Sequence, residues 1–280
     1  MEKLPTPYAE LNSVLADLAQ SVRTILGGNF VGAYLQGSFA VGDFDAHSDV
    51  DFIVVVKEEL AEGEVAALHG MHERVYGRDS AWAQHLEGSY YPQRALRQHA
   101  ERDAWLWFLD HGSSELIQSA HCNTIVVRWV LREHGVTLAG PAPVTLVDAM
   151  PVVALRGEIL AKMRKWGDEI LAHPDEYNNR FYQSYVVLQY CRMLHDLHTG
   201  YPGSKRAGAE WAKAHLDAAW VGLIDRTWAG RPNPAVAVRE RADLADFAAT
   251  LEFVRYMLNE ARRYARRARV NERCAAYNVP

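Results

Sequence analysis

The spacing of apolar residues divides the first part of the chain into helical and extended segments. In residues 11–26 the apolar side chains recur at intervals of three and four, which is the period of an amphipathic helix. Residues 30–36 have the composition of a strand, and residues 50–56 (VDFIVVV) form a β-branched, continuous run typical of a central strand. We also expect a helix over residues 58–76 and a strand over residues 81–90.

The second part of the chain has an almost entirely helical pattern. A turn-rich stretch, GPAP at residues 140–143 followed by Pro151, separates it from the first part. Helical spacing then recurs in four segments, near residues 153–172, 180–198, 204–217 and 238–268. These patterns predict an α+β protein with two domains. The N-terminal domain (residues 1–151) has a mixed β-sheet flanked by helices, and the C-terminal domain (residues 152–280) is an all-α helical bundle.

Composition narrows the class of protein. Hydrophobic residues make up 49% and charged residues 23% of the 280 positions, as in ordinary globular proteins. The net charge of −5 argues against non-specific nucleic-acid binding and suits a small cationic substrate. The three cysteines are widely separated, and no apolar run approaches the ~20 residues of a membrane span. We therefore expect a cytoplasmic, monomeric protein without a signal peptide and with neither nucleic acid nor membrane as partner.

Two aspartates precede the strongest strand, in the stretch GSFAVGDFDAHSDVDF. Asp49 and Asp51 point to the same side of the chain, because side chains alternate along a strand. Two carboxylates this close raise each other's energy, and Mg²⁺, which prefers carboxylate oxygens, would relieve that repulsion. The turn at Gly37 and Ser38 opens a short helix whose free N–H groups suit a phosphate. The alternative is a surface turn followed by two solvated acids.

This stretch resembles the signature of the nucleotidyltransferase superfamily, in which Gly-Ser and Asp-x-Asp are about ten residues apart. The resemblance implies that Asp49 and Asp51 hold magnesium, with two ions expected, and that Gly37, Ser38 and Ser48 bind the nucleotide. In the pattern of the aminoglycoside adenylyltransferases, AQHLEGSYYP supplies the third carboxylate, Glu87, as metal ligand and general base. The alternative for Glu87 is an exposed strand glutamate.

The C-terminal part resembles the streptomycin/spectinomycin adenylyltransferases in VVLQYCRMLHDLHTGYPGSKRAGAEWA, as does VVRWVLREHGVTLAGP before it. This implies magnesium-dependent transfer of AMP from ATP to a substrate hydroxyl, with release of pyrophosphate, in a cleft between the domains. It also implies that Arg192 and Lys205 face the ATP phosphates, with Arg231 as a weaker candidate. A charge within an apolar helix is costly without a partner, which fits Arg192. The alternatives are a structural salt bridge for Arg192 and an ordinary surface lysine for Lys205.

The expected acceptor site departs from the family pattern. Aminoglycosides are polycations rich in hydroxyls, so carboxylates and aromatic faces bind them. Asn178 and Tyr182 stand where the family has two acids, whereas Asp175 and Glu176 are nearby but shifted. This departure weakens the case for streptomycin and spectinomycin as acceptors. Trp105 is a further candidate for a stacking face.

Three functions compete at this point. The first is an adenylyltransferase acting on an aminoglycoside or aminocyclitol antibiotic, which would give resistance. The second keeps the chemistry but modifies a hydroxyl of another metabolite or of a protein. The third is a non-catalytic nucleotide-binding regulatory module, against which the complete set of three acids argues.

Overall fold

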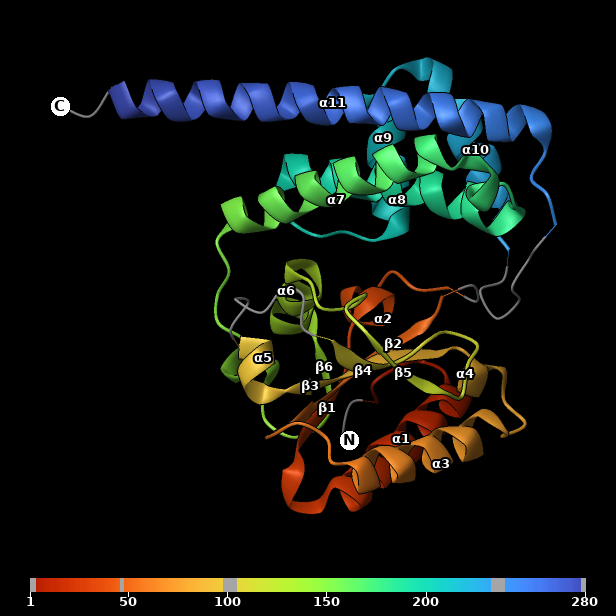
Figure 1. Ribbon diagram of the computed structural model, residues 1–280, viewed down its shortest axis with the longest axis vertical. Coiled ribbons are helices and arrows are strands. Elements are labelled where there is room, and N and C mark those ends of the chain that lie inside the picture. The colour runs from red at the N-terminus through yellow and green to blue at the C-terminus, as the bar shows by residue number, and fades with distance from the viewer. Residues whose placement is uncertain (1–3, 46–47, 98–104, 233–239, 278–280) are drawn as a thin grey trace. The chain divides into compact units, whose positions relative to one another are not determined.

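The structure is a computed structural model that describes residues 4–45, 48–97, 105–232 and 240–277, with side chains described up to residue 268. The chain divides into two compact units, one reaching to Met150 and the other beginning at Pro151. The first unit contains the sheet, and the second is mostly helical (Figure 1).

The first unit is built on a six-stranded sheet with the order β5-β4-β3-β2-β1-β6. β2 and β3 are parallel, and the other neighbouring pairs are antiparallel, so the predicted mixed sheet is confirmed. The strands are β1 (Phe30–Leu35), β2 (Val50–Val56), β3 (Leu86–Pro92), β4 (Leu106–Leu109), β5 (Leu116–Ser119) and β6 (Val136–Ala139). The helices are α1 (Ala9–Leu26), α2 (Gly37–Val41), α3 (Glu62–Tyr76), α4 (Ala81–Gln84), α5 (Gln93–Arg97) and α6 (Ile125–His134), with 3₁₀ turns at Gly27–Asn29 and Pro143–Thr145.

Helices cover both faces of this sheet, because the strand residues alternate between two apolar cores. Phe52 and Val54 of β2 face the core formed with α1 and α3. Ile53 and Val55, the residues between and after them, face a second core that includes Leu96 of α5 and Leu131 of α6. The same alternation places Asp51, two positions before Ile53, on the face that α5 and α6 cover.

Two predicted elements of the first unit have other bounds in the structure. The helix expected over 58–76 begins at Glu62, because the Glu64 carboxylate accepts a hydrogen bond of 2.8 Å from the N–H of Ala61 and closes its first turn. The strand expected over 81–90 is split into α4 and β3. The helical turn at its start carries Trp82, whose ring lies 5.0 Å from that of Tyr8. Aromatic packing therefore determines this segment more than its strand-like composition.

The second unit packs its helices around α8, whose side chains are buried along most of its length. The helices are α7 (Val152–Ala172), α8 (Arg180–Thr199), α9 (Lys205–His215), α10 (Val221–Gly230) and α11 (Leu244–Tyr277), with 3₁₀ turns at Pro174–Tyr177 and Ala218–Trp220. The predicted all-α character is thus confirmed.

The last helix begins later than predicted. Residues 238 and 239, where the expected segment started, lie outside the described residues. α11 starts at Leu244 because Asp243 Oδ1 accepts hydrogen bonds of 2.9 and 3.0 Å from the N–H groups of Ala245 and Asp246. Among the helices of the described chain, none has the length and apolar character needed to cross a bilayer.

Candidate active site

Strand pairing brings two of the three predicted acids side by side. In the parallel register of β2 and β3, Asp51 lies directly opposite Glu87. Neighbouring strands are about 4.8 Å apart, and paired residues project from the same face, so these carboxyl groups share one surface. Asp49 directly precedes β2, which begins at Val50, so the register places Asp51 and Glu87 but not Asp49. All three side chains are half-buried.

The turn after β1 holds the carboxylate of Asp51. The N–H of Gln36 donates a 2.9 Å hydrogen bond to the Asp51 carbonyl oxygen, which joins the turn to β2. Gly37 has φ +62°, and a Cβ added there would lie 1.9 Å from Asp51 Oδ2. The carboxylate therefore occupies the space that any other residue at position 37 would fill. This contact explains why the motif requires glycine at this point.

Ser38 carries an unsatisfied polar atom beside this carboxylate. Its hydroxyl oxygen is buried and has no hydrogen-bond partner in the part of the chain that the structure describes. Leaving such a group unpaired costs about 1–3 kcal/mol, which a ligand oxygen would offset. α2 is only five residues long, so its dipole is short and the hydroxyl is the stronger argument for an anion site.

These residues fit a hard divalent cation. Asp51 and Glu87, which pair across β2 and β3, offer carboxylate oxygens, the ligands that Mg²⁺ prefers, and Asp49 just before β2 offers a further one. The space over Gly37 is already filled by one of these carboxylates, which fixes its position before any ion binds.

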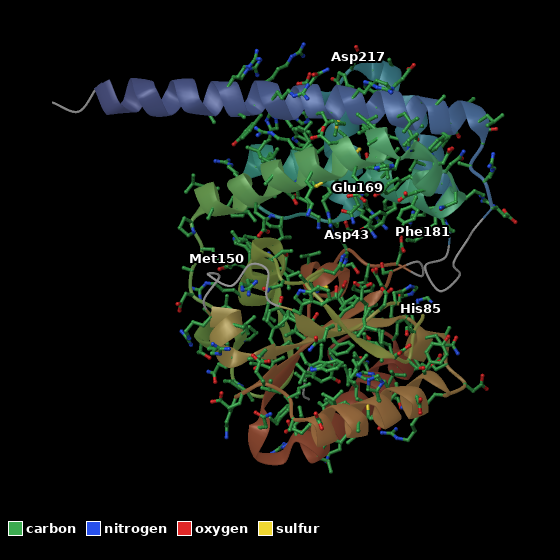
Figure 2. The ribbon with its side chains drawn as sticks, viewed as in Figure 1. Asp43, His85, Met150, Glu169, Phe181 and Asp217 are labelled. Carbon is green, nitrogen blue, oxygen red and sulfur yellow. The ribbon has the colours of Figure 1, made fainter. Side chains whose placement is uncertain are left out.

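Ser48, predicted to bind nucleotide, makes hydrogen bonds within its own loop. Its Oγ accepts a hydrogen bond of 2.9 Å from the N–H of Asp45, and its N–H donates one of 3.0 Å to the Asp45 carbonyl. The loop starts at Asp43, which is labelled in Figure 2. The N–H of Asp43 donates a 3.1 Å hydrogen bond to the Ser38 carbonyl. In this arrangement Ser48 shapes the loop that leads into β2.

Arg192 and Lys205 come from consecutive helices of the second unit. Arg192 is half-buried on α8, and its guanidinium has no hydrogen bond or ion pair with the described residues. Lys205 is the first residue of α9, and its Nζ lies 5.5 Å from the centroid of the Tyr185 ring.

A glycine allows the two helices to approach at this point. A Cβ at Gly208 of α9 would lie 2.5 Å from the Arg192 Cα, so only glycine permits this contact. The N-cap of α9 is Ser204, whose Oγ accepts a 2.9 Å hydrogen bond from the N–H of Ala207. Lys205 is thus fixed at a helix start where its charge opposes the dipole, and an anionic ligand would stabilise it.

An aromatic cluster forms around the first turns of α8. The ring centroids of Tyr182 and Tyr177 are 5.1 Å apart, and Phe181 stacks on Tyr185 at 5.6 Å. Trp166 of α7 contacts Tyr185 edge-on at 5.8 Å. Tyr182 is the most exposed ring of this aromatic cluster, with 37% of its surface accessible.

Beside the aromatic cluster lies an acid, Glu169, that the sequence analysis did not identify. Glu169 of α7, labelled in Figure 2, accepts at Oε1 a 2.6 Å hydrogen bond that the Tyr177 hydroxyl donates. Burial, together with this hydrogen bond, raises the pKa of Tyr177 to about 12. The Tyr177 hydroxyl therefore stays protonated at neutral pH and continues to donate to Glu169, which orders the Glu169 carboxylate. The available signal was its position near the end of a helix that leads into the acidic segment.

The other predicted acceptor residues are spread along the segment before α8. Asp175 and Glu176 are exposed in the 3₁₀ turn Pro174–Tyr177. The side-chain oxygen Oδ1 of Asn178 is buried and unpartnered within the described residues. Asn179 instead caps α8 by accepting a 2.9 Å hydrogen bond from the N–H of Tyr182. Asn178 is thus the one of these side chains with an unmet hydrogen-bonding need.

Trp105 lies at the other end of the sheet from the acids. It directly precedes β4, which is antiparallel to β3, and Trp107 pairs with Tyr90. Glu87 is at the start of β3, so about five residues, or roughly 17 Å, separate the two positions along the strand direction. Trp105 is 66% exposed, whereas Trp107 packs against the core.

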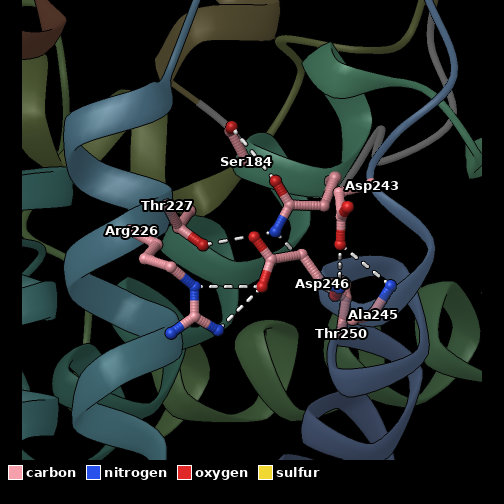
Figure 3. Close-up of polar contacts among 8 residues, drawn as sticks. Ser184, Arg226, Thr227, Asp243, Ala245, Asp246 and Thr250 are labelled. Atoms are coloured by element: carbon pink, nitrogen blue, oxygen red, sulfur yellow. Dashed lines mark hydrogen bonds and ion pairs between the residues drawn. The ribbon is translucent and has the colours of Figure 1, made fainter.

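A polar network fixes the start of α8 against its neighbours (Figure 3). Gln183 donates from Nε2 to Thr227 Oγ1 of α10 and to Thr250 Oγ1 of α11, each at 3.3 Å. Arg226 of α10 pairs with Asp246 of α11 at 2.7 Å. These contacts join three helices and hold the aromatic cluster in place.

Comparison with known proteins agrees with both units. The nucleotidyltransferase domain family matches residues 15–100, and the family of the aminoglycoside adenylyltransferase C-terminal domain matches residues 145–260. The chain is 24% identical to an aminoglycoside (3'') (9) adenylyltransferase of Escherichia coli, over 90% of this chain and 95% of that protein. A Shigella flexneri enzyme of the same description is also 24% identical, with the same coverage.

A solved structure has the same fold over most of its length. It is the spectinomycin adenyltransferase AAD(9) from Enterococcus faecialis, determined with ATP and spectinomycin. The TM-score is 0.66 at 15% identity, covering 89% of this chain and 98% of that chain. With paired acids at the Gly-Ser turn and a matching helical unit, this chain is a nucleotidyltransferase that belongs to the aminoglycoside adenylyltransferase family.

Proposed function

We propose that the protein transfers AMP from ATP to a hydroxyl of an aminoglycoside or aminocyclitol antibiotic and releases pyrophosphate. The observation that carries this proposal is the register of β2 and β3, which sets Asp51 opposite Glu87 while Asp51 lies against the Gly37 backbone. A carboxylate that had only to be solvated would need neither the pairing nor the glycine.

In this proposal Asp49, Asp51 and Glu87 would hold magnesium. The ion, with two copies expected, would neutralise charge that develops on the triphosphate. Glu87 accepts the proton of the attacking hydroxyl, whose oxygen forms a bond to the α-phosphorus as the bond to pyrophosphate breaks. The Ser38 hydroxyl, buried without a partner in the described chain, donates to a phosphate oxygen.

We assign Arg192 and Lys205 to the triphosphate. A half-buried guanidinium without an ion pair in the described chain is costly unless an anion binds it. Arginine suits phosphate because its planar donors bind two oxygens at once. The Enterococcus structure, which was determined with ATP, supports the choice of nucleotide.

For the acceptor we assign the aromatic cluster and the acids beside it. Tyr182 presents an exposed ring, and Glu169 is ordered by Tyr177. Asp175, Glu176 and Asn178 complete a surface of carboxylates, amide and aromatic rings that suits a hydroxylated cation. We propose that the protein acts as a monomer in the cytoplasm, where ATP is available.

The test is pyrophosphate release with ATP and Mg²⁺ across a panel of aminoglycosides and aminocyclitols, with mass spectrometry of each acceptor. The proposal predicts a gain of one AMP on at least one drug and none with the Asp51→Asn variant. Glu73→Gln, which alters an exposed acid on α3, is the matched control and should react normally. AMP found only on a metabolite or a protein would overturn the antibiotic assignment while keeping the chemistry. Binding of ATP without any transfer would favour the regulatory module.

A further inference from the structure

Glu87 has two neighbours that the proposed reaction does not use. His121 and Cys122 follow β5, and one ligand atom from each of these three residues lies within 4.8 Å of the others. His121 is exposed, and Cys122 retains 9% of its surface. An imidazole, a thiol and a carboxylate are the set of ligands that Zn²⁺ and similar cations bind.

The backbone that carries these neighbours is held in place. The Tyr91 hydroxyl donates a 2.5 Å hydrogen bond to the Cys122 carbonyl, and the N–H of His121 donates one of 3.0 Å to Ser119 Oγ. Just after them, Asn123 Oδ1 accepts a 2.6 Å hydrogen bond from Arg128, which is 1% exposed. The fold therefore holds the backbone that places both side chains near Glu87.

The distances suit a bound ion after a small adjustment. Tetrahedral ligands of zinc are about 3.5 Å apart, given bonds of roughly 2.0–2.3 Å. The three ligand atoms therefore need to close by at most about 1.3 Å, which is within the reach of side-chain rotation. Three protein ligands leave a fourth position for water, and the exposed imidazole gives the ion access from solvent.

We propose that Glu87, His121 and Cys122 form a site for a thiophilic divalent cation such as Zn²⁺, which removes Glu87 from the catalytic set and so inhibits the enzyme. When the ion binds, the Cys122 thiol loses its proton to solvent and forms a metal–thiolate bond. Mg²⁺ does not compete for the sulfur, because it prefers oxygen ligands. The inhibition, but not the binding, rests on the proposed function.

Binding is tested with Co²⁺, which reports thiolate ligation by a near-ultraviolet charge-transfer band. The protein should bind one Co²⁺ with this band, and Cys122→Ser should abolish the band. Removing a residue that only hydrogen-bonds to a metal ligand lowers metal affinity about 10–100-fold. Because His121→Gln removes a ligand itself, this variant should bind Co²⁺ about 100-fold more weakly. Circular dichroism of each variant shows whether it is folded.

The remaining cysteines provide the control. Cys274→Ser should keep the band, and Cys191 does not compete because burial raises the pKa of its thiol to about 12. Absence of the band in the unmodified protein, or its survival in Cys122→Ser, would overturn the site.

Inhibition is tested separately in the transfer assay. Micromolar Zn²⁺ with excess Mg²⁺ should slow AMP transfer by the unmodified protein and leave Cys122→Ser much less affected. Equal inhibition of both proteins would overturn the inhibitory role. A cobalt band without any AMP transfer would overturn the proposed function alone, because the spectrum does not depend on turnover.

Discussion

The sheet unit and the helical unit hold their functional side chains in different ways. In the sheet unit, strand register and a glycine place Asp51 beside Glu87, so the backbone itself fixes the chemistry. In the helical unit, Arg192 and Tyr182 project from the surface of α8. Tyr182 contacts another ring, and Arg192 has no hydrogen bond or ion pair with the described residues. The main chain thus fixes the proposed catalytic acids, whereas the proposed nucleotide and acceptor contacts of the helical unit are made by side chains on a helix surface.

Among substitutions that spare the acids themselves, the largest effect should come from breaking the backbone contact at the Gly-Ser turn. Gly37→Ala places a methyl group 1.9 Å from Asp51 Oδ2 at a positive φ, so the carboxylate must move. A displacement of about 1 Å costs on the order of 100-fold in turnover. Steady-state kinetics measure this loss. Gly28→Ala, whose added Cβ meets no atom within 4 Å, is the matched control. Unchanged turnover in Gly37→Ala would show that the Asp51 position is not critical.

A smaller effect is expected from the phosphate contact of the helical unit. Arg192→Ala should raise the KM for ATP by about 10–100-fold, because a hydrogen bond to a charged group contributes about 1.5–3 kcal/mol. The KM for the acceptor should change little. Arg164→Ala removes an exposed arginine on α7 and should leave both constants unchanged. A shift confined to the acceptor KM would move Arg192 from the nucleotide to the acceptor site.

Acid should destabilise the protein through His72, a buried histidine of the sheet unit. Burial, and then the nearby His69, lowers the pKa of His72 to about 3 from its ordinary 6.5. The unfolded chain therefore binds an extra proton between these values, and stability falls as pH drops from about 6.5 towards 3. At pH 5 the loss is about 2 kcal/mol, or roughly 30-fold in the unfolding constant.

Urea unfolding of the full chain at pH 7 and pH 5 measures this dependence. His72→Asn should be less stable than the unmodified protein at pH 7 but should lose less stability on acidification, because it lacks the titrating ring. An equal pH dependence in both proteins would assign the acid sensitivity to other groups.

The smallest effect is expected at the aromatic cluster. Tyr182→Ala should raise the acceptor KM by about 2–10-fold, since a stacking contact contributes about 0.5–1.5 kcal/mol. Tyr182→Phe keeps the ring and should retain most of the affinity. If both variants bind the acceptor as well as the unmodified protein does, acceptor recognition does not depend on this ring.

The sequence predicted the elements whose pattern is local. β2 was predicted with its observed bounds because its β-branched run needs no partner to be recognised. The strands β4, β5 and β6 were missed, since each has four residues and is stabilised by pairing with a neighbour. The split of residues 81–90 into α4 and β3 depends on the packing of Trp82, which no local pattern reveals.

The candidate site divides along the same line. The motif predicted Asp51 and Glu87, but only the register shows that they lie opposite each other. Glu169 and His121 were not identified, because their significance comes from tertiary neighbours on other segments, Tyr177 and Glu87. Sequence spacing identifies residues that act within one motif, whereas sites shared between segments appear only in the fold.

The role of the Asp51–Glu87 pair is tested by comparing ATP binding and AMP transfer in Glu87→Gln. Glutamine keeps the shape of the side chain but cannot accept the proton, so we predict nearly unchanged ATP affinity by calorimetry. Transfer to the acceptor, followed in a single turnover, should fall by about 1,000-fold, within the range attributed to a general base. Transfer at the unmodified rate with ATP still bound would contradict the role of this pair as the catalytic centre.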